Sequence, residues 1–140
     1  IGIFNVAVEI YSRNLAKNVS AGSIERFAKR VFSPQKVPEK YLEFVGPDLS
    51  RRQKTILANN EDLKQTASTL ANLEKRYSEI RVPVEVIHGK KDWLLDHELH
   101  GQAFADELPL SNLTLLDGVG HMAHHASPYA VNKAIERIID

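Results

Sequence analysis

Residues 82–92, with the sequence V-P-V-E-V-I-H-G-K-K-D, decide the fold of this chain. The segment 82–87 is short, rich in β-branched residues and nearly all apolar, which predicts a parallel strand covered on both faces. The strand is expected to end at His88-Gly89, so that Asp92 lies in the loop at its carboxyl end. Because open α/β sheets place reactive groups at this edge, Asp92 is a candidate site residue.

The sequence that follows predicts a helix, a second strand and a second helix. The first helix is expected at residues 97–108 with Asp96 as its N-cap, the strand at 113–116, and the last helix from Ser127 and Pro128. A strand and helix, repeated at this spacing, predict the α/β fold class with a parallel sheet. The inner helix faces are expected to be Leu99, Ala103, Phe104 and Leu108 in the first helix and Val131, Ala134, Ile135 and Ile138 in the second.

Residues 1–79 predict helices throughout. A first helix is expected from residue 3 to about 16, where apolar residues follow a helical period. A second helix is expected to have Ser23 as its N-cap and to end just before Pro34, since proline disfavours helical dihedral angles in the residue before it. The chain is therefore expected to divide into a helical segment, 1–79, and an α/β segment, 80–140.

More helix is expected between Pro38 and residue 79. Pro38 can occupy the first position of a short helix that Gly46-Pro47 ends. An apolar residue then recurs every seven positions, with Asn59-Asn60 as a candidate break between two helices. Because the companion positions are mostly polar, we expect packed helices of a small layer rather than a coiled coil. The row consists of Leu49, Ile56, Leu63, Leu70 and Tyr77.

Composition and charge exclude several classes of function. The 140 residues are 43% hydrophobic and 26% charged, which is typical of a globular protein. Eighteen basic and eighteen acidic side chains cancel, so no net field attracts nucleic acid or an anionic membrane. The absence of cysteine excludes disulfides, zinc–thiolate sites and a cysteine nucleophile. Apolar runs such as residues 1–8 are too short to cross a bilayer and no leader is recognisable, so we expect a soluble, cytoplasmic protein.

His121 is the candidate partner of Asp92, because it follows the second predicted strand as Asp92 follows the first. Neighbouring parallel strands lie about 4.8 Å apart, so side chains in the two loops can meet. A carboxylate that accepts the Nδ1 hydrogen of an imidazole fixes its tautomer and leaves Nε2 free as a general base. Gly118 and Gly120 give the loop the backbone freedom to bring the ring over the sheet.

The two motifs, V-P-V-E-V-I-H-G-K-K-D at 82–92 and L-L-D-G-V-G-H-M-A-H-H at 115–125, resemble the end of the α/β-hydrolase family. In that family an Asp after one strand and a His after the final strand complete a catalytic triad. Residues 1–79 resemble, less specifically, the helical cap that the family often inserts ahead of these strands. The resemblance implies that Asp92 is the triad acid and His121 the base, with no metal and no organic cofactor.

The resemblance also implies a nucleophile that this sequence lacks. The family carries it earlier, on a G-x-S-x-G turn, or as an Asp in epoxide hydrolases and haloalkane dehalogenases. The chain begins at Ile1 and its single methionine is Met122, so we expect the C-terminal half of a longer hydrolase. Its substrate would be a small hydrophobic ester, lactone, epoxide or similar compound, and this half alone is expected to be inactive. Since two strands do not make a stable sheet, the missing N-terminal half or a second copy of the chain is the expected partner.

Other readings of the same residues stay open. Trp93 and Met122 follow the acid and the base directly and are candidate substrate-binding residues, although they can equally pack the loops. Asp96 is a rival acid that we expect to cap a helix instead. A different class of function, a non-catalytic ligand-binding or regulatory module on the same fold, is the alternative to the enzyme. The other histidines are expected to be structural or solvated, and a metal site formed by His121, His124 and His125 is disfavoured because no carboxylate cluster accompanies it.

Overall fold

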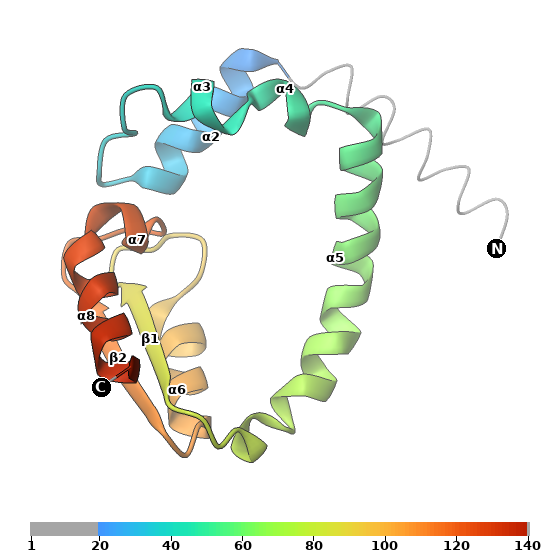
Figure 1. Ribbon diagram of the computed structural model, residues 1–140. Helices are drawn as coiled ribbons and strands as arrows, with labels where there is room; N and C mark the ends of the chain where they lie inside the picture. The colour runs from blue at the N-terminus through green and yellow to red at the C-terminus, as the bar shows by residue number, and fades with distance from the viewer. Residues whose placement is uncertain (1–19, 140) are drawn as a thin grey trace, which may run out of the picture. The chain divides into compact units, whose positions relative to one another are not determined.

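The structure is a computed structural model that describes residues 20–139 (Figure 1). The chain forms two compact units, one of residues up to Phe27 with Pro38–Asn72, the other of Ala28–Val37 with the chain from Leu73 onward. The helix expected at residues 3–16 lies outside the described residues. No helix in the described part of the chain is both long enough and apolar enough to cross a membrane.

Helix α2, Ala21–Phe32, begins and ends at polar signals in the sequence. Its N-cap is Ser20, whose Oγ accepts a hydrogen bond from the Ser23 amide at 3.1 Å. The prediction that Ser23 is the cap is therefore wrong, because the helix starts one turn earlier. The predicted end before Pro34 is confirmed.

The helices that follow match the prediction only in part, because the short helix expected from Pro38 begins at Tyr41 instead. Helices α3, Tyr41–Val45, and α4, Pro47–Ser50, flank Gly46, which has φ 61° and ends α3 as a left-handed residue. Helix α5, Gln53–Glu74, runs without interruption, so the predicted break at Asn59-Asn60 is wrong. Asparagine lowers helix propensity by only a fraction of a kcal/mol, roughly 0.7 at most, and cannot end a helix by itself. A short 3₁₀ helix, η1, spans Tyr77–Glu79.

In the first unit, only some of the apolar residues that recur every seven positions are buried. Ile56 is 7% exposed, whereas Leu63 and Leu70 are 68% and 50% exposed. Both leucines therefore have half or more of their surface exposed in the described part of the chain. The sequence pattern predicted the helix correctly but not which of its apolar residues is covered.

The second unit is built on two parallel strands, β1, Val84–Gly89, and β2, Ser111–Leu116. The register pairs Val84 with Ser111 and Gly89 with Leu116, so both strands end at the same level. The strand β1 starts two residues later than predicted, because Pro83 has no amide hydrogen to donate to a ladder. Helix α8, Pro128–Ile139, contacts β1, and helix α6, Ala103–Glu107, contacts β2. This parallel pair with helices confirms a mixed α/β architecture.

The connection between the strands contains a π-helical segment, η2, His97–Gln102, before α6. A π turn holds more residues than an α turn, so the apolar face rotates away from the position that an α-helical period predicts. Gly101, Ala105 and Leu108 are buried, whereas Leu99 is 73% exposed and Ala103 is also exposed. The prediction that Leu99 and Ala103 face inward is therefore wrong. Gly101 packs on the ring of His88, because a Cβ at this position would lie 2.8 Å from His88 Nδ1.

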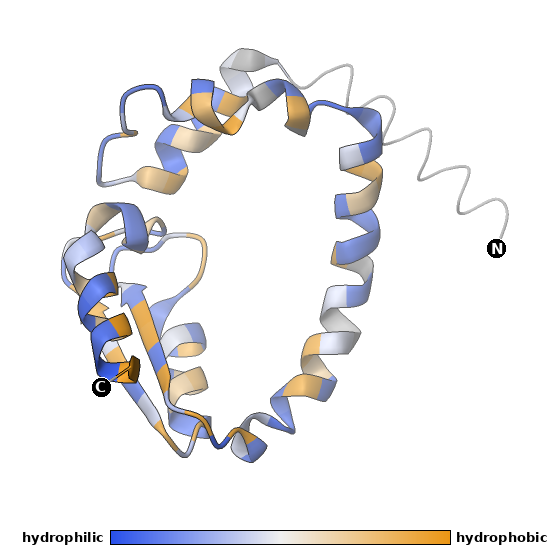
Figure 2. Ribbon diagram, in the orientation of Figure 1, coloured by the Kyte–Doolittle hydropathy of each residue, from blue (hydrophilic) through white to orange (hydrophobic). Residues whose placement is uncertain are grey.

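The core of the second unit is small. Phe32 is 2% and Ala134 is 4% exposed, but Ile135 and Ile138, which were predicted to face inward, are 52% and 46% exposed. A sheet of two strands is too narrow to cover the whole apolar face of α8. Figure 2 shows apolar residues along β1 and toward the C-terminal end of α8. A four-residue helix, α7, Ala123–Ala126, follows the loop after β2.

Candidate active site

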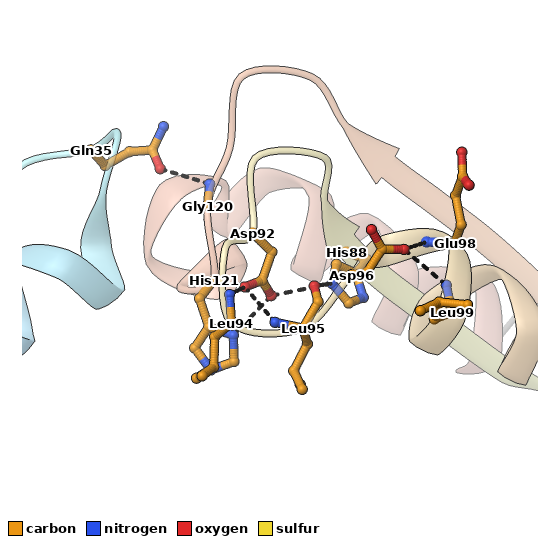
Figure 3. A network of polar contacts seen from close by, with 10 residues as sticks. All are labelled: Gln35, His88, Asp92, Leu94, Leu95, Asp96, Glu98, Leu99, Gly120 and His121. Atoms are coloured by element: carbon orange, nitrogen blue, oxygen red, sulfur yellow. Dashed lines mark hydrogen bonds and ion pairs between the residues drawn. The ribbon is translucent and has the colours of Figure 1, made fainter.

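Asp92 lies in the tight turn that follows β1, and its carboxylate faces into that turn. The Asp92 amide donates to the Gly89 carbonyl at 3.1 Å, and Oδ1 accepts from the amides of Leu94 at 2.8 Å and Leu95 at 3.1 Å (Figure 3). The side chain is only 4% exposed. Two backbone donors thus fix the carboxylate and leave its other oxygen, Oδ2, for a further partner.

The other oxygen of Asp92 contacts His121, in the loop after β2. The Nδ1 of His121 lies 2.8 Å from Asp92 Oδ2, and the histidine side chain is 28% exposed. The predicted hydrogen bond between these two side chains is therefore present. Because an ionised carboxylate can only accept, Nδ1 carries the hydrogen, and Nε2 is not used in this bond.

The surroundings of Asp92 favour its ionised form. Burial alone would raise the pKa of this carboxyl, and it is the largest single influence. The hydrogen bonds from the Leu95 amide, the His121 ring and the Leu94 amide together outweigh burial, and the pKa is held below its usual range. Asp92 is consequently a carboxylate at neutral pH, as an acceptor for His121 must be.

Backbone contacts lock the two loops together. The Lys91 amide donates to the Val119 carbonyl at 2.7 Å, and the Lys90 amide donates to the Leu116 carbonyl at 3.0 Å. Any Cβ at Gly89 would overlap the carbonyl oxygens of Val119 and Gly120, so only glycine allows this close approach. The distance between the acid and the base is thus set by main chain as well as by side chains.

His88 is a second histidine at the carboxylate, a contact that sequence analysis missed. Its Nε2 lies 3.0 Å from the Leu95 carbonyl oxygen and 3.2 Å from Asp92 Oδ2. Both neighbours are acceptors, so this Nε2 carries a hydrogen. The sequence did contain a signal for this contact, because His88 and Asp92 are four residues apart across a tight turn at a strand end.

Gln35 also reaches the site, and nothing in the sequence pointed to it. Its Nε2 donates to the Gly118 carbonyl at 2.8 Å, and its Oε1 accepts from the Gly120 amide at 3.0 Å. These contacts span 83 and 85 residues of sequence, beyond the reach of a local pattern. Gln35 belongs to the segment Ala28–Val37, which forms part of the same compact unit as the strands.

The structure places Trp93 against the segment 28–37. Its Nε1 donates to the Arg30 carbonyl at 2.6 Å, and the guanidinium carbon of Arg30 lies 3.8 Å from the centre of the indole ring. Met122 is half-buried, and its carbonyl accepts from the amides of His125 and Ala126 at the start of α7. A role for Trp93 and Met122 in binding substrate stays a prediction.

Asp96, His124 and His125 have contacts of their own. Asp96 caps η2, accepting from the amides of Glu98 at 2.9 Å and Leu99 at 3.0 Å, as predicted. The rings of His124 and His125 lie 4.6 Å apart, and burial lowers the pKa of His124. Across residues 20–139, no cluster of three or more His, Asp or Glu side chains could hold a metal ion.

Comparison with known proteins adds a structural likeness. No protein-family model matches the chain, and no curated protein matches its sequence. Among solved structures, the chain is similar to a membrane phospholipase A, described as a novel bacterial virulence factor, with a TM-score of 0.54 and 17% identity. The likeness covers 86% of this chain but only 38% of the phospholipase chain. At this identity it bears on the fold alone, and the neighbour that shares the fold is a hydrolase.

Proposed function

We propose that this chain is the C-terminal half of an α/β-hydrolase, contributing the acid and the base of a nucleophile–His–Asp triad whose nucleophile lies outside this sequence. The observation that carries the proposal is the hydrogen bond of 2.8 Å between Asp92 and His121, made at the carboxyl ends of two adjacent parallel strands. Hydrolases of several folds use this pairing of a buried carboxylate with an imidazole.

In the proposed reaction each residue has one task. His121 takes a proton through Nε2 from the nucleophile or from the attacking water, and returns it to the leaving group. Asp92 holds the ring in the tautomer that leaves Nε2 available, and its charge stabilises the imidazolium that forms. The pair has no chemistry to offer alone, because bond formation to the substrate needs the nucleophile and an oxyanion hole.

The substrate class that we propose is a hydrophobic ester, with lactones, epoxides and similar compounds as the wider set. Leu94 and Leu95 follow Asp92 after Trp93 and are 44% and 40% exposed, so exposed apolar side chains lie in the loop that carries the acid. The similar solved structure is a phospholipase A, and its name favours ester chemistry within that set.

The decisive experiment uses the longer protein. The coding sequence that extends upstream of Ile1 is expressed, and hydrolysis of aryl esters with short and long acyl chains is measured for the wild type, Asp92→Asn and His121→Ala. Asp92→Asn is expected to lower kcat by about 10⁴-fold and His121→Ala by about 10⁶-fold. Asp96→Asn is the matched control, because this carboxylate likewise accepts two backbone amides, those of Glu98 and Leu99. A small residue in place of the nucleophile, or unchanged kcat in Asp92→Asn, would contradict the proposal.

The 140-residue chain gives a complementary test. It is expected to hydrolyse aryl esters no faster than its own His121→Ala variant, since neither residue can replace the nucleophile. Clear turnover that disappears in His121→Ala would place the whole reaction within these residues and refute the division between two halves.

A further inference from the structure

The loop that carries His121 is bound on both sides. On one side the Lys91 amide donates to the Val119 carbonyl at 2.7 Å, which ties the loop to the turn that carries Asp92. On the other side the Gln35 side chain accepts from the Gly120 amide (Figure 3) and donates to the Gly118 carbonyl. Gly120 directly precedes His121 in the chain. The base therefore emerges from a loop held between its acid and a distant glutamine.

The orientation of the Gln35 side chain is determined by its two partners. A carbonyl oxygen requires a donor, so the Gly118 oxygen faces Nε2, and the Gly120 amide requires an acceptor, so it faces Oε1. No other orientation of the amide satisfies both groups. The pair of bonds spans residues 118 to 120 and resists rotation of the peptide units that lead into His121.

Close packing leaves this part of the loop little room. A Cβ at Gly120 would overlap the Ser33 carbonyl oxygen, so the backbones of 33–35 and 118–120 are in direct contact. Trp93, next to Asp92, bonds the Arg30 carbonyl of the same segment at 2.6 Å. The segment 28–37 thus touches both the residue after the acid and the residue before the base.

We propose that Gln35 is a positioning residue for His121, which holds the ring in the orientation where Nδ1 donates to Asp92. It acts through the backbone of Gly118 and Gly120 and touches neither substrate nor the reacting nitrogen. This inference rests on the proposed function for its catalytic meaning, because a base that leaves its acid is held in neither the correct tautomer nor the correct direction.

The test measures the tautomer of His121 in the complete 140-residue chain. Ring nitrogen resonances of ¹⁵N-histidine-labelled protein are recorded at a pH where the imidazole is neutral, and His121→Gln assigns the signal. Gln35→Met keeps the length and volume of the side chain and removes both hydrogen bonds. The matched control is Gln102→Met, which removes one bond from a glutamine to Asp106 at 2.8 Å within the same unit, away from the loop.

The ratio of the Nδ1–H to the Nε2–H form of His121 is the readout. In Gln35→Met the ratio is expected to fall roughly threefold or more, the size that the loss of one hydrogen bond of modest strength produces. Gln102→Met should leave it unchanged, although both variants lose stability in urea. Gln35→Glu retains an acceptor for the Gly120 amide but has no donor for the Gly118 carbonyl, so it should also lower the ratio. If Gln35→Met does not fold, Gln35→Asn replaces it, because the shorter side chain cannot reach both backbone groups.

An unchanged tautomer ratio in the Gln35 variant would overturn the proposal, since it would show that the two bonds support only stability. That result would leave the hydrolase proposal standing, because no activity is measured. Conversely, an active-site assay that refutes the triad would leave the tautomer result valid as a statement about the loop.

Discussion

At the scale of single residues, Asp92 uses its two carboxylate oxygens differently. Oδ1 accepts two backbone amides and fixes the turn, while Oδ2 lies 2.8 Å from His121 and 3.2 Å from His88. Asp96 repeats the first half of this arrangement on the amides of Glu98 and Leu99 but has no histidine at hydrogen-bond distance in the contacts described. Comparing substitutions of the two aspartates therefore distinguishes the contribution of the bonds to backbone amides from the contribution of the contact with imidazole.

Asp92→Ala should destabilise the chain more than Asp96→Ala. The first substitution leaves two amides and a half-buried imidazole without their acceptor, which costs about 2–3 kcal/mol of unfolding free energy. The second removes only an exposed helix cap, whose amides then bond to water. Urea unfolding at pH 7 measures both. Equal losses would mean that the histidine contacts of Asp92 add nothing to stability.

Gly120→Ala tests the packing of the base loop on the segment 33–35. The added methyl would overlap the Ser33 carbonyl oxygen, and such overpacking is expected to cost about 1–3 kcal/mol. Gly22→Ala in α2 is the control, because its Cβ would meet Arg26 and Ser20 only at 3.5 and 3.9 Å. That substitution should stabilise the helix by roughly 0.5–1 kcal/mol. A Gly120→Ala chain as stable as the wild type would show that the two backbones can separate freely.

At the scale of secondary-structure elements, Glu85 joins β1 to α8 and to β2. Arg137 donates to both of its carboxylate oxygens, at 2.8 and 2.6 Å, and Asn112 donates at 2.9 Å. The hydrogen bonds from Arg137 are the main reason that the pKa of Glu85 lies at about 2 rather than 4.5. A charged pair of this geometry holds the end of α8 against the sheet.

Acid should therefore weaken this link in a defined range of pH. A carboxyl whose pKa is lower in the folded than in the unfolded chain contributes stability above the unfolded value, and loses it as the pH falls through the folded value. For Glu85 that range runs from about 4.5 down to about 2. Urea unfolding between pH 5 and pH 2 should show a smaller loss in Glu85→Gln than in the wild type. Glu79→Gln is the control, since Glu79 forms an exposed ion pair with Arg76 at 2.9 Å and not with Arg137.

Sequence reasoning predicted elements where a residue imposes a backbone rule, and missed those set by tertiary contact. Pro34 ends α2 and Asp96 caps η2, as each must by its own chemistry. In the π-helical turn at 97–102, Gly101 packs on His88, a contact that no helical period predicts. Asp92 and His121 could be found because strand ends bring neighbouring loops together, whereas Gln35 reaches Gly120 across 85 residues.

At the scale of the whole molecule, apolar residues of the second unit lack cover. The strands pair only with each other within residues 20–139, and Ile135 and Ile138 of α8 are 52% and 46% exposed. Unpaired strand edges and exposed apolar surface both favour association. The missing half of the hydrolase core is the partner that we propose, and a second copy of this chain is its substitute when that half is absent.

Light scattering on the purified chain should accordingly detect species larger than one copy. Ile135→Lys should reduce the average mass, because it places a charge on the uncovered face of α8. Asn132→Lys, on the same helix at an exposed polar position, should leave the mass unchanged. A single 15.7 kDa species that unfolds cooperatively would show that this chain buries its apolar core by itself, and would contradict the proposal of a partner.

The two attachments of the base loop also imply an order of assembly. The bond between Asp92 and His121 closes 29 residues of chain, and the bond between Gln35 and Gly120 closes 85. The longer closure costs about 1 kcal/mol more in chain entropy, so the acid and base can meet before the segment 28–37 docks, and the segment can leave first. Native-state hydrogen exchange should then find the Gly120 amide less protected than the Lys91 amide that bonds to Val119. Equal protection would mean that the two closures form and open as one cooperative unit.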